Sequence, residues 1–251
     1  MRFRESPASC EILRLCWALM KSIGLIGGLG PESTLDYYRS LINTHRALHP
    51  EADPPSIIIN SVNMKYALRC LEAKRLEDLA EFFVLELHKL ARAGADFALI
   101  TANTPHIVFD EVERRSPLPL ISIVEATAER AHQSGFKKIG LLGTRFTMQA
   151  SFYPEVFSRR QMQIHVPDEH DQAFIHERYF KELVNGVFLD ETRQRLTEII
   201  AHMREKHGIQ AVILGGTELP LILRGAEAAG VPLLDTTQIH VESALRRLGE
   251  G

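Results

Sequence analysis

Threonine and asparagine residues follow several short apolar runs of the sequence, at points where a small carboxylate could bind. The runs at 97–101, 138–142 and 211–214 each lead into such a polar segment. Hydroxyls, amides and backbone N–H groups at strand ends are suitable donors to a carboxylate. We therefore predict a substrate-binding set made of Asn103, Thr104, Thr144, Thr147 and Thr217. Asn63 is a weaker candidate of the same kind, and helix capping by these residues is compatible with binding.

A glycine-rich turn follows the first apolar run, in the segment Gly27-Gly28-Leu29-Gly30-Pro31. Gly28 and Gly30 permit a tight turn and a close backbone approach, so both are predicted to contact the substrate. Pro31 suits the first turn of a helix, whose N-terminus attracts anions. The spacing is not G-x-G-x-x-G, and dinucleotide binding is therefore not supported. A plain strand-to-helix turn is the alternative.

Two titratable residues adjoin the polar segments and are the predicted catalytic groups, His106 and Glu218. His106 comes four residues after Ala102, which is about one helical turn, and histidine is the usual general acid/base near neutral pH. Glu218 could act as a base if burial raises its pKa, or it could orient a neighbouring group. His176 and Lys181, in a helical segment farther along, are further candidates if that helix reaches the site.

The elements that must position these residues alternate between short apolar runs and long helical patterns. Such alternation is typical of βαβ units with mainly parallel sheets. The predicted strands are 23–26, 56–61, 97–101, 120–123, 138–142, 163–166, 211–214 and 233–234. Helices are predicted between them, for example at 77–93 and 192–206. The fold class is therefore α/β.

The sequence also repeats itself, which predicts two similar Rossmann-like lobes. The segments that begin at residues 21, 94 and 119 resemble those that begin at 137, 208 and 232, in the same order and at offsets of 113 to 116 residues. We expect the first lobe to comprise 20–117 plus 231–251 and the second to comprise 118–230. The lobes should be related by pseudo-twofold symmetry and enclose a cleft at the carboxyl ends of their strands.

Composition restricts the class of protein further. The net charge of −3 comes with interspersed acids and bases, so no basic stripe predicts nucleic-acid binding. No apolar run is long enough to predict a membrane span. Three cysteines are too few for a secreted disulfide scaffold, which favours a cytoplasmic protein, and no cysteine or histidine cluster predicts a metal site. Residues 1–19 are expected to be an extension ahead of a start at Met20.

Taken together, the motifs resemble those of the aspartate/glutamate racemase family over residues 20–248. The matching segments are Gly27–Glu32, Asn103-Thr104-x-His106, Leu142-Gly143-Thr144-x-x-Thr147, Thr217-Glu218 and Asp235-Thr236-Thr237-x-x-His240. The resemblance implies a PLP-independent isomerase that uses no cofactor, acts at the Cα of a small acidic amino acid and forms a homodimer. It also implies two facing cysteines, one from each lobe, that remove and return the Cα proton.

The positions of those two cysteines hold other residues here, Ala102 and Gly216. Neither can carry a proton, and Cys70 lies within a predicted helix, where a buried small side chain is expected. Three readings follow. The chain could be an isomerase with non-thiol bases, a lyase or decarboxylase of a small carboxylic acid, or a carboxylate-binding protein without catalysis.

Overall fold

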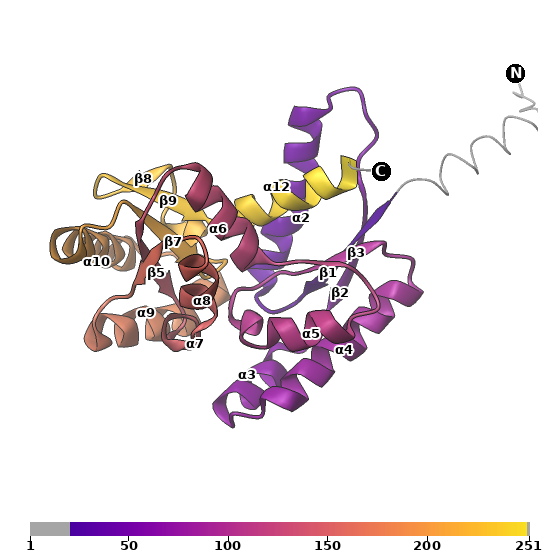
Figure 1. The fold of residues 1–251 in the computed structure, drawn as a ribbon, viewed down its shortest axis with the longest axis horizontal. Coiled ribbons are helices and arrows are strands. Elements are labelled where there is room, and N and C mark those ends of the chain that lie inside the picture. The colour runs from indigo at the N-terminus through magenta and orange to yellow at the C-terminus, as the bar shows by residue number, and fades with distance from the viewer. Residues whose placement is uncertain (1–20, 250–251) are drawn as a thin grey trace, which may run out of the picture.

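The computed structural model describes residues 21–249, which form two α/β lobes side by side (Figure 1). The sheet of the first lobe is entirely parallel and has the strand order β2-β1-β3-β4. Its strands are β1 (Ser22–Gly27), β2 (Ser56–Ser61), β3 (Phe97–Ile100) and β4 (Leu120–Ile121).

The sheet of the second lobe has the order β6-β5-β7-β9-β8, in which only the short β8 is antiparallel. Its strands are β5 (Lys138–Gly143), β6 (Gln163–His165), β7 (Ala211–Gly215), β8 (Glu227–Ala228) and β9 (Val231–Asp235). Without β8 the order follows that of the first sheet, strand for strand along the chain. The predicted two-lobed α/β fold with parallel sheets is confirmed.

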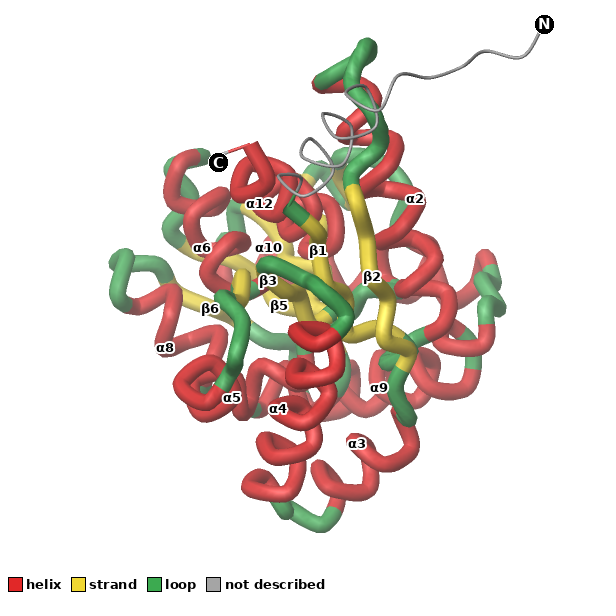
Figure 2. The backbone as a smooth tube through the Cα atoms, turned by 90° about the vertical axis from the view of Figure 1, so that its right-hand side faces the viewer, coloured by secondary structure: helices red, strands yellow, loops and turns green. Residues whose placement is uncertain are grey.

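Helices cover both faces of each sheet (Figure 2). Those of the first half are α2 (Pro31–Leu48), α3 (Met64–Glu72), α4 (Leu76–Arg92), η1 (Thr104–Val108), α5 (Phe109–Arg115) and α6 (Ile123–Gln133). Those of the second half are α7 (Arg145–Gln149), α8 (Phe152–Ser158), α9 (Glu169–Lys181), η2 (Leu183–Asn185), α10 (Asp190–His207), α11 (Leu219–Ile222) and α12 (Thr236–Gly249). The last of these, α12, crosses from the second lobe to pack against α2 and α6 (Figure 1).

Each face of each sheet has its own apolar cluster, because side chains alternate along a strand. In β1, Ile23 and Leu25 pack under α2 and α12, whereas Ile26 packs under α3 and α4. In β7, Ile213 packs toward α6 and α8, whereas Leu214 packs toward α9 and α10. Strands buried on both faces read as continuous apolar runs, which is why the sequence located them well.

The predicted lobe boundaries are wrong for two strands. β4, predicted to lie in the second lobe, pairs with β3 of the first sheet, and β9, predicted to lie in the first lobe, pairs with β7 of the second. Each strand completes the sheet that the preceding strands began. The internal repeat is consistent with this pairing, since it places the segments that begin at 119 and 232 at equivalent positions of the two halves.

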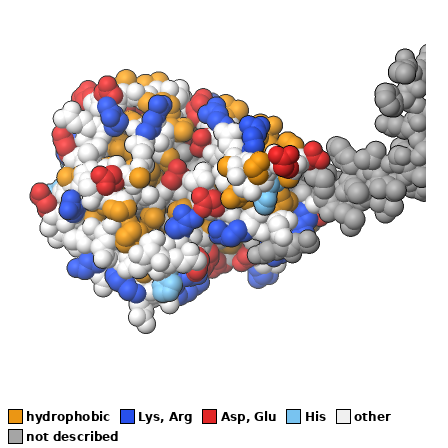
Figure 3. Space-filling view, turned by 90° about the horizontal axis from the view of Figure 1, so that it is seen from above, with side chains coloured by type: hydrophobic (Ala, Val, Ile, Leu, Met, Phe, Trp, Pro, Cys, Tyr) orange, Lys and Arg blue, Asp and Glu red, His pale blue; other side chains and the backbone are white. Residues whose placement is uncertain are grey.

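The surface carries both signs of charge. On the face shown in Figure 3, lysine and arginine side chains are interspersed with aspartate and glutamate. Within residues 21–249, no helix is both long and apolar enough to span a bilayer. The predicted extension at 1–19 lies outside the described residues.

Candidate active site

A small cavity lies between the lobes, at the carboxyl ends of strands from both sheets. The first lobe contributes Leu29, Met64, Ala67, Leu68, Leu71, Ala102, Asn103, Thr104 and Pro105, and the second contributes Thr144, Tyr179, Phe180, Gly215 and Gly216. Its volume is about 40 Å³. A cavity of this size has room for a few waters at most, so side chains or lobes must move to admit a substrate.

Three threonine hydroxyls form a triangle that joins the lobes. The Oγ1 atom of Thr104 lies 3.0 Å from that of Thr144 and 2.9 Å from that of Thr147, and the latter two lie 3.2 Å apart. Thr144 also caps α7 by accepting the Thr147 N–H. The structure therefore brings three of the predicted binding residues together, and Thr104 and Thr144 line the cavity itself. Their hydroxyls could instead donate to a bound carboxylate.

Asn103 lines the cavity, but its side-chain amide binds the second lobe. Its Oδ1 accepts a hydrogen bond of 2.6 Å from the Tyr153 hydroxyl, and its Nδ2 donates to Thr236 Oγ1 at 3.0 Å. We infer that this amide holds the lobes together. The predicted binding role of Asn63 is not supported, because its exposed side chain caps α3 through the Tyr66 N–H and does not line the cavity.

Gly28 and Gly30, the two predicted binding glycines, are each required for a different structural reason. Gly28 has φ +77°, and a Cβ there would lie 2.6 Å from Ser61 Oγ, so only glycine fits the turn after β1. Gly30 precedes α2, and an added Cβ would overlap Oε1 of Glu218 from the other lobe. Gly30 thus lets a buried carboxyl group of the second lobe contact the backbone of the first.

Glu218 is buried, and two hydroxyl groups donate to the same oxygen of its carboxyl group. Tyr179 and Thr217 both donate to Oε2, the latter at 3.2 Å. The buried Oε1 has no hydrogen-bond partner among the described residues. Burial raises the pKa of Glu218, and hydrogen bonds from Tyr179 and Thr217 oppose that rise. A carboxylate with a raised pKa is a stronger proton acceptor than an ordinary glutamate, as the predicted role of Glu218 requires.

Tyr179 was not among the predicted site residues. It lies on the buried side of α9 with its ring edge-on to Phe180, and it lines the cavity. An added Cβ at Gly216 would overlap its ring atom Cε2 and would lie 3.1 Å from its hydroxyl. Of the candidates on the same helix, Lys181 is exposed and paired with Glu177, and His176 accepts the Arg145 N–H. A tyrosine four residues after the buried Ile175 was the available signal.

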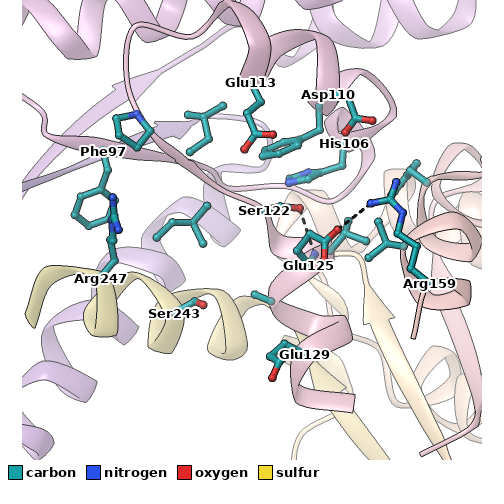
Figure 4. Close-up of a pocket in the computed structure, with 18 of the residues that line it drawn as sticks. Phe97, His106, Asp110, Glu113, Ser122, Glu125, Glu129, Arg159, Ser243 and Arg247 are labelled. Atoms are coloured by element: carbon teal, nitrogen blue, oxygen red, sulfur yellow. Dashed lines mark hydrogen bonds and ion pairs between the residues drawn. The ribbon is translucent and has the colours of Figure 1, made fainter. Parts of the chain in front are cut away.

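The structure does not support the predicted catalytic role of His106. Its Nε2 accepts the Ile123 N–H at 3.3 Å, so its Nδ1 carries the hydrogen and donates to the Ala102 carbonyl at 3.1 Å. Its ring stacks on Phe109, and both residues line a groove of about 660 Å³ that shares no lining residue with the cavity between the lobes (Figure 4). Burial, then the neighbouring His240, lower the pKa of His106 to about 3. A neutral imidazole with both nitrogens bound to backbone groups has a structural role.

The larger groove does not resemble a site built for chemistry. Its walls come from α5, α6, α8 and α12, with charged residues such as Glu113 and the ion pair between Glu125 and Arg159 projecting into it (Figure 4). It includes none of the threonines that follow the strands. In the described part of the chain, the one cluster with metal-ligand spacing is Asp168, His170 and Asp171 at the start of α9. Asp168 caps that helix and Asp171 pairs with Arg195, so both already have structural partners.

Two mainly parallel-sheet lobes that enclose polar strand ends beside a buried carboxyl group define a two-lobed α/β protein with its candidate site between the lobes. The family model described as Asp/Glu/hydantoin racemase matches residues 26–244. The chain belongs to this family.

Relatives with known names or structures agree with this assignment. The broad specificity amino-acid racemase RacX of Bacillus subtilis is 27% identical over 155 residues, which is 60% of this chain and 66% of RacX. An aspartate racemase homologue from Pyrococcus horikoshii is 35% identical, with a TM-score of 0.79 over 92% of this chain and 100% of that one. The aspartate racemase of Picrophilus torridus, 23% identical, shares the fold with a TM-score of 0.75 over 91% of this chain and 94% of its own.

Proposed function

We propose that the chain is a cofactor-independent isomerase of the racemase type, which moves the Cα proton of a small amino acid or related carboxylate. The observation that carries this proposal is the meeting of Thr104 and Thr144, from opposite lobes, in a cavity beside the buried Glu218. Hydroxyl and backbone donors could stabilise the negative charge that develops on the substrate carboxylate as the Cα proton leaves.

The cavity favours a substrate with an uncharged side chain, rather than the acidic amino acid that we predicted from the resemblance. Most of its lining is apolar, and the described lining residues include no lysine, arginine or histidine. A second carboxylate would be desolvated there without a cationic partner, which is costly. The broad specificity named for RacX supports a substrate of this wider class.

A lyase or decarboxylase of a small carboxylic acid is the second candidate, and one observation favours it. At the predicted thiol position of the first lobe, Ala102 lines the cavity with a methyl group that cannot transfer a proton. Protonation from a single face is sufficient for decarboxylation, whereas inversion requires proton transfer at both faces. A carboxylate-binding protein without turnover is the third candidate. A homodimer, a cytoplasmic location and the absence of nucleic-acid partners stay predictions from sequence and family resemblance.

Exchange of the Cα proton with solvent tests the proposal directly. We expect the protein, incubated in D₂O with L- and D-amino acids and small dicarboxylates, to remove the Cα–H signal of at least one uncharged amino acid in ¹H NMR. Aspartate and glutamate should exchange more slowly, because the cavity offers their side chains no cationic group. A chiral assay of the same samples measures inversion separately from exchange.

The other readings predict different results. Release of CO₂ from a malonate-type acid without Cα exchange of any amino acid would favour the lyase. Saturable binding without exchange or product would favour the non-catalytic protein. Preferential exchange of aspartate or glutamate would contradict the proposed preference for uncharged side chains.

A further inference from the structure

The second-lobe wall of the cavity holds a tyrosine at the place where a cysteine side chain at residue 216 would begin. Any Cβ at Gly216 would overlap the ring of Tyr179, whose hydroxyl would then lie 3.1 Å from it. The Tyr179 side chain is buried in the apolar cluster of α9 and α10 and is 7% exposed. The phenol group of Tyr179, which belongs to α9, thus occupies the space that a side chain at residue 216, after β7, would fill.

The same hydroxyl is connected to a proton acceptor. Tyr179 donates its O–H to Oε2 of Glu218, and Thr217 donates to that oxygen as well. The other carboxyl oxygen lies against Gly30 and has no partner among the described residues. A packed ring fixed by a hydrogen bond to a buried carboxyl group resembles the arrangement by which enzymes orient an acid/base side chain.

We propose that Tyr179, paired with Glu218, is the catalytic residue that transfers the Cα proton at the second-lobe face of the cavity, in the role that a thiol would otherwise have. This proposal rests on the proposed function. In the forward step the Cα–H bond breaks, and its electron pair moves into the enediolate of the substrate carboxylate. The proton passes to the Tyr179 oxygen while the phenolic proton passes to Glu218. The reverse step returns a proton to Cα.

The coupled transfer avoids a free phenolate. Burial and the adjacent Glu218 raise the pKa of Tyr179 well above its ordinary value, so the phenol stays protonated at neutral pH. A phenol that gains one proton as it loses another needs no such phenolate. Glu218 therefore acts on the substrate through Tyr179, as a positioning residue and final proton acceptor.

The site is asymmetric, and this has a measurable consequence. Among the described residues that line the cavity, Tyr179 is the one side chain that titrates. The first-lobe side offers Ala102 and the hydroxyl of Thr104. Exchange at the face toward Tyr179 is therefore expected to be faster than inversion, because inversion requires a proton from the opposite side.

Substitution of Tyr179 with phenylalanine removes the hydroxyl but keeps the ring in place. We expect Cα–H exchange by Tyr179→Phe to fall at least about 100-fold, which is the usual scale for loss of a general acid/base. The exchange rate of Glu218→Gln should fall by a similar factor. The double variant should exchange only slightly more slowly than either single variant, because the two groups act as one unit. The matched control is Tyr37→Phe, which removes another buried phenolic hydroxyl, bonded to His240 outside the site. Its exchange should match that of the unmodified protein.

Each outcome of this comparison is decisive. The proposal is overturned, and the proposed function retained, if the unmodified protein exchanges Cα–H and Tyr179→Phe keeps that rate within a few-fold while its circular dichroism is unchanged. It is also overturned if the unmodified protein shows no exchange but Gly216→Cys combined with Tyr179→Ala does, because Tyr179 would then block the site. Absence of exchange in every variant would overturn both this proposal and the proposed function.

Discussion

Replacing Gly216 with cysteine is expected to lower the free energy of unfolding by about 1–3 kcal/mol, the usual cost of overpacking a well-packed core. The new Cβ would overlap the ring of Tyr179, and that ring is held by neighbouring apolar side chains and by its bond to Glu218. Gly216 is not among the glycines with positive φ, so backbone strain does not contribute. Urea denaturation followed by circular dichroism measures the change.

Two further variants make this prediction specific. Ala102→Cys, at the other predicted thiol position, should lower the free energy of unfolding less than Gly216→Cys does, because alanine already has a Cβ and lines the cavity. The double variant Gly216→Cys/Tyr179→Ala should lose less free energy of unfolding than the two single variants lose together. The difference should be about 1 kcal/mol or more, which is a coupling typical of residues in contact. Additive effects, or an unchanged stability of Gly216→Cys alone, would contradict the assignment of Tyr179 to this space.

Acidification is expected to destabilise the protein through two buried neutral histidines. Burial lowers the pKa of His240 to about 4, and that of His106 is lowered to about 3. His240 Nε2 donates to the Ile121 carbonyl, and its Nδ1 accepts from Tyr37. The unfolded chain binds protons at an ordinary pKa of about 6.5, whereas the folded chain does not. Stability is therefore full above about pH 6.5 and is lost as the pH falls toward the folded values, by about 1.4 kcal/mol per pH unit for each histidine.

Comparison with a histidine variant isolates this effect from that of the carboxyl groups. Burial raises the pKa of Glu218 and Asp235, and these groups act in the opposite sense, because their stabilising contribution is lost as pH rises. His106→Asn keeps a donor near the Ala102 carbonyl but does not titrate. Between pH 7 and pH 5 its free energy of unfolding should fall by about 2 kcal/mol less than that of the unmodified protein. An equal fall in both proteins would show that His106 is not buried in the neutral form.

The fold was predictable because the central strands of both sheets, β1, β3, β5 and β7, are buried on both faces. The eight predicted strands match eight of the nine in the structure within about two residues; the ninth is the two-residue β8. The predicted convergence of strand-end residues was largely correct, since Thr104 and Thr144 meet across the cavity and Glu218 lies beside it through Tyr179. Parallel strands bring their carboxyl ends to one edge of a sheet, so sequence order alone implies this proximity.

The missed features depend on contacts between elements that are distant in the sequence. The spacing of His106 from Ala102 predicted proximity correctly, but the direction of the ring depends on the Ile123 N–H at the start of α6. Likewise, the space at Gly216 is filled by Tyr179, 37 residues earlier in the chain. Neither the helical pattern of α9 nor the glycine pair at the end of β7 indicates that these two residues meet.

Exchange of Cα–H by a cysteine-free variant tests most directly the claim that proton transfer here does not depend on a thiol. In the described residues the one cysteine is the buried Cys70, which does not line the cavity, and Cys10 and Cys16 lie outside the described residues. The full chain with Cys10→Ser, Cys16→Ser and Cys70→Ala should exchange the Cα proton of its best substrate at the rate of the unmodified protein. Loss of exchange in this variant, with its circular dichroism spectrum preserved, would contradict the account and assign the chemistry to a cysteine.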